Sequence, residues 1–93
     1  MTEPMPTWEG FLIPTLKAME DGRIRHRREI QPIVADSLNL THEQRQVLIA
    51  SGQPMYANRI GWGLSFLFNV GALERPKRGH YSITDSGREL ISE

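Results

Sequence analysis

The hydrophobic pattern of this chain changes in its last quarter, and that change limits the fold more than any other feature. Residues 72–75 and 81–83 are short strand candidates, and Pro76-Lys77-Arg78-Gly79 between them is a turn signal. The residues before 72 have helical spacing instead. Helices followed by a two-stranded hairpin with a basic tip are typical of a winged helix-turn-helix, in which the hairpin is the wing. We therefore predict a mainly α fold with a small β-hairpin, consisting of about five helices and a two-stranded wing.

The first and last helices are marked by clear signals. Apolar residues at helical spacing predict a helix over residues 7–20. Pro14 should kink this helix by removing a backbone donor, and Asp21-Gly22 should end it. Near the other end of the chain, Thr84-Asp85 should cap a final helix.

Two shorter helices are expected in the middle of the chain. One runs from about residue 28 or 29 to about 38–39, so that Pro32 falls in the first turn, where its amide would lack a partner anyway. The next covers residues 42–50. Thr41 and Gln44 form a capping-box pattern at its start.

The longest predicted helix covers residues 57–71, capped around 56–58 and closed by Gly71. At 100° per residue, one wide apolar arc should face the core. This arc contains Ile60, Trp62, Phe66, Leu67 and Val70. The opposite arc contains Ala57, Asn58, Gly61, Leu64, Ser65, Phe68 and Asn69. Leu64 and Phe68 form an exposed partner-binding patch or, if the helix phase differs by a residue or two, belong to the core.

Length and composition indicate one domain. A chain of 93 residues should form a single domain over 1–93, with about 5–90 ordered. It has no cysteine, which excludes disulfides, thiolate zinc sites and thiol catalysis. The longest apolar-rich stretch, residues 60–73, is shorter than the roughly 20 residues of a membrane span. The N-terminus lacks the basic and apolar runs of a signal peptide. We expect a soluble, cytoplasmic protein that does not enter a membrane.

Charge is unevenly distributed along the chain. The 11 Lys and Arg residues balance 11 Asp and Glu residues, so the formal net charge is zero. The first 21 residues are mainly acidic, whereas residues 22–34 and 75–80 are mainly basic. Separated charge of this kind can give a neutral molecule one basic face. Such a face is suited to phosphate contacts, which position a protein on nucleic acid without selecting a sequence.

Short motifs along nearly the whole chain carry a family resemblance. They are Ile13-Pro14, Leu16, Arg28-Glu29-Ile30, Leu40-Thr41, Ser51-Gly52, Asn58-Arg59-Ile60-Gly61-Trp62, Gly71, Leu73-Glu74, Gly79, Tyr81 to Asp85 and Gly87 to Leu90. With these motifs the chain resembles the N-terminal winged-helix domain of Mrr-type restriction endonucleases, enzymes that cut modified (methylated) DNA. The resemblance implies a domain that binds duplex DNA and chooses the target. It also implies a parent protein with a separate C-terminal nuclease domain, of which this chain is a fragment or a free-standing relative.

The candidate DNA contacts follow from the longest helix and the basic clusters. Asn58 and Ser65 can read base edges, and asparagine is suited to adenine. Gly61 would let the backbone approach the DNA closely. The full set of predicted DNA contacts is Arg25, Arg27, Arg28, Tyr56, Asn58, Gly61, Ser65, Lys77, Arg78 and His80.

Catalytic motifs are missing from the sequence. A nuclease of this family carries an acidic residue two positions before a lysine, but Lys17 and Lys77 have Thr15 and Arg75 there. The zinc-protease pattern that His42 would begin has glutamine in place of its second histidine. We expect this chain to have no catalytic residues, no metal site and no cofactor.

Two other functions fit the same fold. Zero net charge and the pair Leu64 and Phe68 are compatible with a protein-interaction module, in particular a homodimer, that does not bind DNA strongly. A stand-alone transcriptional regulator would need no nuclease. Neither an aromatic cage nor a pocket for a flipped base is visible in the sequence.

Overall fold

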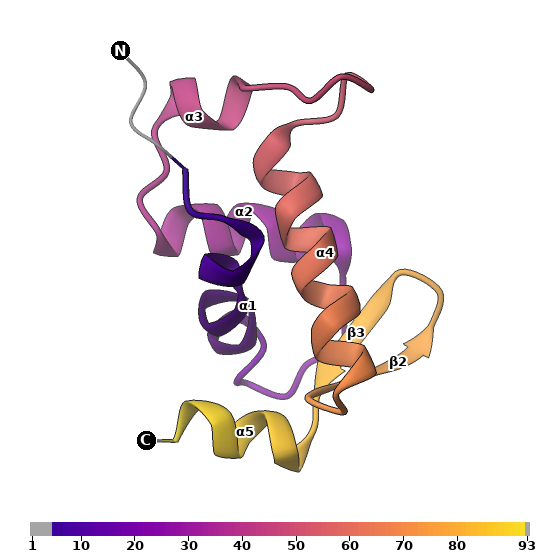
Figure 1. The fold of residues 1–93 in the computed structure, drawn as a ribbon. Helices are drawn as coiled ribbons and strands as arrows, with labels where there is room; N and C mark the ends of the chain where they lie inside the picture. The colour runs from indigo at the N-terminus through magenta and orange to yellow at the C-terminus, as the bar shows by residue number, and fades with distance from the viewer. Residues whose placement is uncertain (1–4, 93) are drawn as a thin grey trace.

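The computed structural model describes residues 5–92 as one layered helical body with a small sheet at its edge (Figure 1). Its elements are the 3₁₀ helix η1 (Trp8–Phe11), α1 (Leu12–Ala18), β1 (Arg25–His26), α2 (Arg27–Ser37), α3 (His42–Gln46), α4 (Met55–Asn69), β2 (Leu73–Lys77), β3 (His80–Ile83) and α5 (Asp85–Ile91). Five α-helices and the β2–β3 hairpin confirm the predicted winged-helix architecture within this part of the chain.

The sheet has three antiparallel strands in the order β1-β3-β2. Leu73 pairs with Ile83 in the hairpin, and Arg25 pairs with Tyr81 on the other side of β3. The sequence predicted the hairpin but not β1. Because β1 has only two residues, it is too short to show a strand pattern.

The core lies where α1, α2 and α4 meet. Its largest fully buried side chains are Phe11, Leu16, Met19, Ile30, Val34, Ile60, Leu64 and Leu67. Burying side chains of this kind contributes about 1.5–3 kcal/mol each before entropy is counted. The wing joins this core through Leu73, Tyr81 and Ile83, so its base is fixed while its tip is exposed.

The N-terminal helical segment differs from the prediction of one kinked helix over 7–20. It consists of η1 followed directly by α1. Pro14 is the third residue of α1, so the donor it lacks belongs to the first turn and would have no helical partner. Arg59 of α4 holds the segment before η1 in place, because its guanidinium donates a hydrogen bond to the Pro6 carbonyl at 2.6 Å.

The α2 helix begins earlier than predicted, at Arg27, because His26 caps it. The amide of Arg28 donates to His26 Nδ1 at 3.1 Å, and Glu29 Oε1 accepts from the His26 amide at 3.1 Å. This reciprocal capping box moves Pro32 beyond the first turn, so its predicted position there is wrong.

The α3 helix confirms the predicted cap but is shorter than the predicted 42–50. The Gln44 amide donates to Thr41 Oγ1 at 3.1 Å, and Gln44 Oε1 accepts from the Thr41 amide at 2.7 Å. The helix ends at Gln46 because the backbone at Val47 is extended. Residue 48 then forms a bridge with residue 54, which continues the extended path.

The α4 helix starts at Met55, two residues before the predicted start, with Pro54 at its N-cap. Its end agrees with the sequence: Gly71 has φ +82°, and the next amide, of Ala72, donates to the Leu67 carbonyl at 2.8 Å. The predicted cap of α5 is also confirmed, since the Gly87 amide donates to Thr84 Oγ1 at 3.1 Å. Within residues 5–92, no helix is both long and apolar enough to cross a membrane.

Candidate nucleic-acid interface

The α4 helix buries only part of the predicted core arc: Ile60 and Leu67 lie in the core as expected. Its buried residues are Ala57, Ile60, Gly63, Leu64 and Leu67. Trp62, Phe66 and Val70 were expected in the core, but they are 64%, 42% and 54% exposed. The prediction was wrong for these three residues because apolar residues occur almost all the way round this helix, so periodicity alone could not identify the whole buried arc.

The observed burial along α4 shows whether the two candidate partner-interface residues, Leu64 and Phe68, lie in the core or at the surface. Leu64 is 1% exposed, so the expectation that it forms a partner surface is wrong. Phe68 is 37% exposed, and the Arg75 guanidinium lies 4.7 Å above the centre of its ring. Arg75 on β2 thereby connects the end of the helix to the wing.

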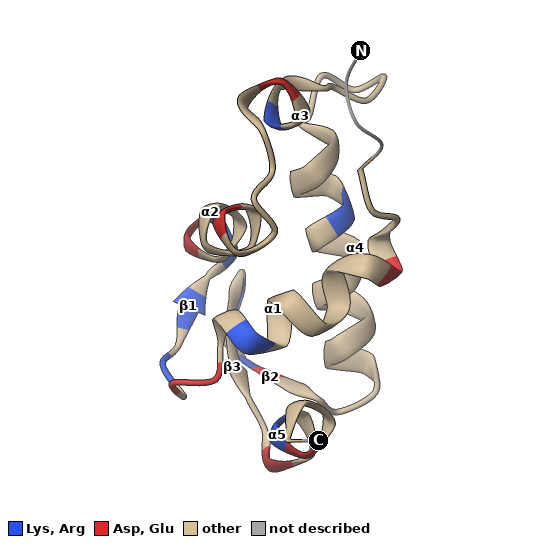
Figure 2. Cartoon of the chain, turned by 90° about the vertical axis from the view of Figure 1, so that its left-hand side faces the viewer, with Lys and Arg blue, Asp and Glu red and all other residues tan. Residues whose placement is uncertain are grey.

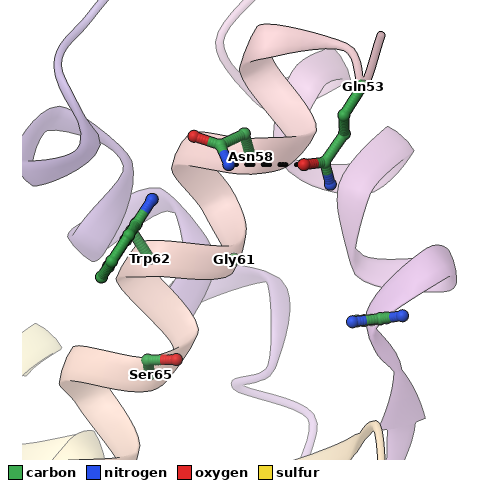
Figure 3. Close-up of a pocket in the computed structure, with 6 residues that line it drawn as sticks. Gln53, Asn58, Gly61, Trp62 and Ser65 are labelled. Atoms are coloured by element: carbon green, nitrogen blue, oxygen red, sulfur yellow. Dashed lines mark hydrogen bonds between the residues drawn. The ribbon is translucent and has the colours of Figure 1, made fainter. Parts of the chain in front are cut away.

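Four predicted contacts share one hollow beside α4. Asn58, Gly61 and Ser65 line a space of about 300 Å³, together with Gln53, Trp62 and Arg27 of α2. Figure 3 shows Asn58 on one turn of α4, Gly61 and Trp62 on the next, and Ser65 on the one after. The side-chain amide of Asn58 donates a hydrogen bond to Gln53 Oε1 at 3.3 Å. Among residues 5–92, a Cβ built on Gly61 would meet nothing within 4 Å apart from the nearby backbone of its own helix, so this part of the helix surface is open.

Two further hollows lie toward the start of α2 and the wing, and Arg27 lines both of them as well as the first. A second space of about 350 Å³ lies between Arg27, Arg28 and Gln31 on α2 and the first turns of α4. A third, of about 380 Å³, is lined by Arg27 and His26 together with Arg75, Arg78, Gly79 and Tyr81 of the wing. We call the surface formed by these three adjoining hollows the basic groove. Figure 2 shows basic residues at β1 and at its junction with α2.

Three other predicted contacts, Arg25, Tyr56 and Lys77, lie outside the three hollows. Arg25 lines none of the three hollows, and its guanidinium is held by Asp21 at 2.7 Å. The Arg23 amide and the Arg25 side chain donate to Asp21 and lower the pKa of that carboxyl. Tyr56 is half-buried against the core. Lys77 is exposed on β2 near the wing tip.

His80 lies at the inner side of the wing and contacts the cap of α2. Its ring centre is 4.9 Å from that of His26, and the rings are nearly perpendicular. Desolvation, followed by the charges of His80, Arg28 and Arg27, lowers the pKa of His26. A neutral ring is what its capping role requires, because Nδ1 must accept a hydrogen bond.

Several groove residues were not identified as contacts from the sequence. Gln31, Gln53 and Arg75 belong to it, and Trp62 was assigned to the core. Arg75 had a usable signal, since it lies in the basic run 75–80. Gln31 and Gln53 had none, because uncharged polar residues occur on any solvent-facing surface. Within residues 5–92, no group of three or more His, Cys, Asp and Glu side chains could hold a metal ion.

Comparison with known protein families identifies the family of this chain. A family model described as the Mrr N-terminal domain matches residues 8–93, nearly the whole chain. The chain belongs to the Mrr N-terminal domain family. It is 31% identical over 91 residues to the type IV methyl-directed restriction enzyme EcoKMrr of Escherichia coli K12. That match covers 95% of this chain but 29% of the relative, and no solved structure matches. The family resemblance inferred from the sequence motifs is confirmed.

Proposed function

We propose that this Mrr N-terminal domain is the DNA-binding and targeting module of an Mrr-like restriction endonuclease. It binds duplex DNA through α4 and the basic wing, and it performs no catalysis. Cleavage belongs to a C-terminal nuclease domain in the parent protein. This domain covers 29% of the restriction enzyme it matches, which leaves most of that enzyme's length for other domains.

The observation that supports DNA binding is the position of Arg27. This exposed residue lines all three hollows of the basic groove, so the polar face of α4, the start of α2 and the wing form one surface. Cations beside a helix with polar, base-reading side chains suit a duplex, because phosphates and base edges lie close together there. The neutral net charge does not oppose this, since binding depends on the local distribution of charge.

The test is fluorescence anisotropy of a labelled duplex, titrated with the domain at low and near-physiological salt. We expect binding that weakens with salt, because the phosphates release their counterions. Arg27→Ala with Arg28→Ala should weaken binding to every duplex. Lys17→Ala removes charge from α1, outside the groove, and should leave affinity nearly unchanged. Absence of binding at low salt would refute the proposal.

Homodimerisation is a second candidate, supported by exposed apolar side chains at the other end of α4. Val70 and Leu90 are each 54% exposed and line one hollow between α4 and α5. Large exposed apolar residues that gather in this way mark interaction surfaces more often than scattered ones do. A dimer formed through this end would leave the basic groove open. Phe68 remains a predicted interface residue.

A further inference from the structure

We propose that a cavity beside the basic groove binds a single nucleobase that has left the DNA stack. Trp8, Trp62, Ser65, Phe66 and Asn69 line this cavity, which we call the aromatic cavity. The inference rests on the proposed DNA binding and adds to it a site for one planar heteroaromatic ring.

The walls of the aromatic cavity are suited to a flat ring. Trp8 from η1 and Phe66 from α4 have ring centres 5.5 Å apart and an interplanar angle of 56°, so the two rings contact each other and form one wall. Trp62, 64% exposed, forms another wall. The volume is about 220 Å³. This is below the roughly 300–1,000 Å³ of sites for drug-sized molecules, so the cavity fits one small ring and not an extended ligand.

The polar residues of the aromatic cavity suit the edge of a base. Ser65 and Asn69 lie on α4, and neither side chain makes a hydrogen bond within residues 5–92. An asparagine amide both donates and accepts, and a hydroxyl can do either. The edges of nucleobases present the same mixture of donors and acceptors. No charged side chain lines the cavity, which favours a neutral ring over a phosphate.

The aromatic cavity is continuous with the proposed DNA surface. Trp62 and Ser65 line both the cavity and the hollow that contains Arg27. Trp62 lies on the face of α4 that points away from the buried Ile60, Leu64 and Leu67. A base that swings out of a duplex lying in the basic groove would therefore reach the cavity along Trp62 without crossing the protein. Enzymes and binding proteins that receive such bases stack them between aromatic side chains.

A pair of duplexes tests this directly. They have the same sequence except for one mismatched position, where leaving the stack costs least. We expect the domain to bind the mismatched duplex more tightly. Trp62→Ala should lower that affinity by roughly 5- to 150-fold, the loss typical of one aromatic stacking partner. Affinity for the paired duplex should change much less. Trp62→Phe should restore most of the preference.

Two matched measurements separate this role from general damage. Leu48→Ala removes an exposed apolar side chain outside the aromatic cavity and should keep the mismatch preference. The chain has two tryptophans, and both line the cavity. Trp8→Phe therefore leaves Trp62 as the reporter, and its fluorescence should be quenched more by the mismatched duplex. Because Trp62 is largely exposed, its variants should melt close to the wild-type temperature.

The possible results are distinguishable. A domain that binds both duplexes equally, with Trp62→Ala weakening them equally, would refute the base site and leave the DNA-binding proposal standing. A wild-type domain that binds neither duplex would refute both. If sedimentation shows a dimer that Trp62→Ala dissociates, a second copy of the chain occupies the aromatic cavity and the base site is refuted.

Discussion

The amide of Arg27 donates a 2.9 Å hydrogen bond to the carbonyl of Gly79. This bond joins the first residue of α2 to the turn of the wing, although the two residues are far apart in the sequence. His26, the cap of α2, packs against the same turn, since a Cβ built on Gly79 would lie 3.0 Å from its Nε2 atom. The orientation of the wing therefore depends on how α2 begins.

Gly79→Ala should destabilise the domain by about 1–2 kcal/mol. Gly79 has φ +76°, which an alanine adopts with strain, and the new methyl group would press on His26. The free energy of unfolding from urea titration measures this effect. Gly61→Ala is the matched control, because its methyl group would enter open space in a helix and should stabilise by roughly 0.5–1 kcal/mol. Equal stability of the two variants would contradict this account of the turn.

Stability should fall as the pH is lowered from about 7 toward 5. The pKa of His26 is lowered in the folded state, so the unfolded state binds the proton more readily. The contribution of His26 is thus present above its unfolded pKa, near 6.5, and is lost as the pH falls through its lower folded pKa. Protonation would remove the cap acceptor and place charge beside His80, Arg27 and Arg28; Glu29 alone would offset it.

His26→Asn tests the origin of that pH dependence. Asparagine caps helices well and does not titrate in this range. Thermal melts of the variant should show a flatter change in Tm between pH 7 and pH 5 than melts of the wild type. His42→Asn changes an exposed histidine on α3 and should keep the wild-type slope. An unchanged slope in His26→Asn would assign the effect to other groups.

Replacing Lys77 and Arg78 by alanine should lower DNA affinity for all sequences alike. Phosphate contacts position a protein without reading bases, and each one lost should reduce the salt slope by about 1. Anisotropy titrations at several salt concentrations give both quantities. Unchanged affinity and slope would exclude the wing from binding, even if α4 contacts the duplex.

Leu90→Asp should convert a homodimer to a monomer. It adds a carboxylate to the mainly apolar hollow between α4 and α5, which Glu89 already lines and from which a partner would exclude water. Sedimentation velocity at high protein concentration measures the change. Leu48→Asp, at a similarly exposed residue in the segment after α3, should have no effect on association. A monomeric wild type would rule out the dimer.

Local signals predicted the features of this fold that depend on neighbouring residues. The Thr41 and Thr84 caps and the Gly71 helix end each involve atoms a few residues apart, and all three are present. The hairpin was predicted for the same reason. The short β1 strand was not, because it exists only through its pairing with β3.

The candidate site was harder to predict because it depends on tertiary packing. The burial of Leu64 and the exposure of Trp62 depend on where η1, α1 and α2 meet α4, and the helix's own pattern was ambiguous. The aromatic cavity brings Trp8 beside Phe66 across most of the chain length. The basic groove was partly foreseen, since Arg27, Asn58 and Arg78 were selected, but their arrangement around Arg27 required the fold.

The uncharged residues of the basic groove make its charge adjustable. Gln31 and Gln53 face the groove and contribute nothing to the core. Each is a position where evolution or an engineer can add or remove a cation at little expense to folding. The charge of the groove can therefore change through these few side chains, while the interior that holds α2, α4 and the wing together stays the same.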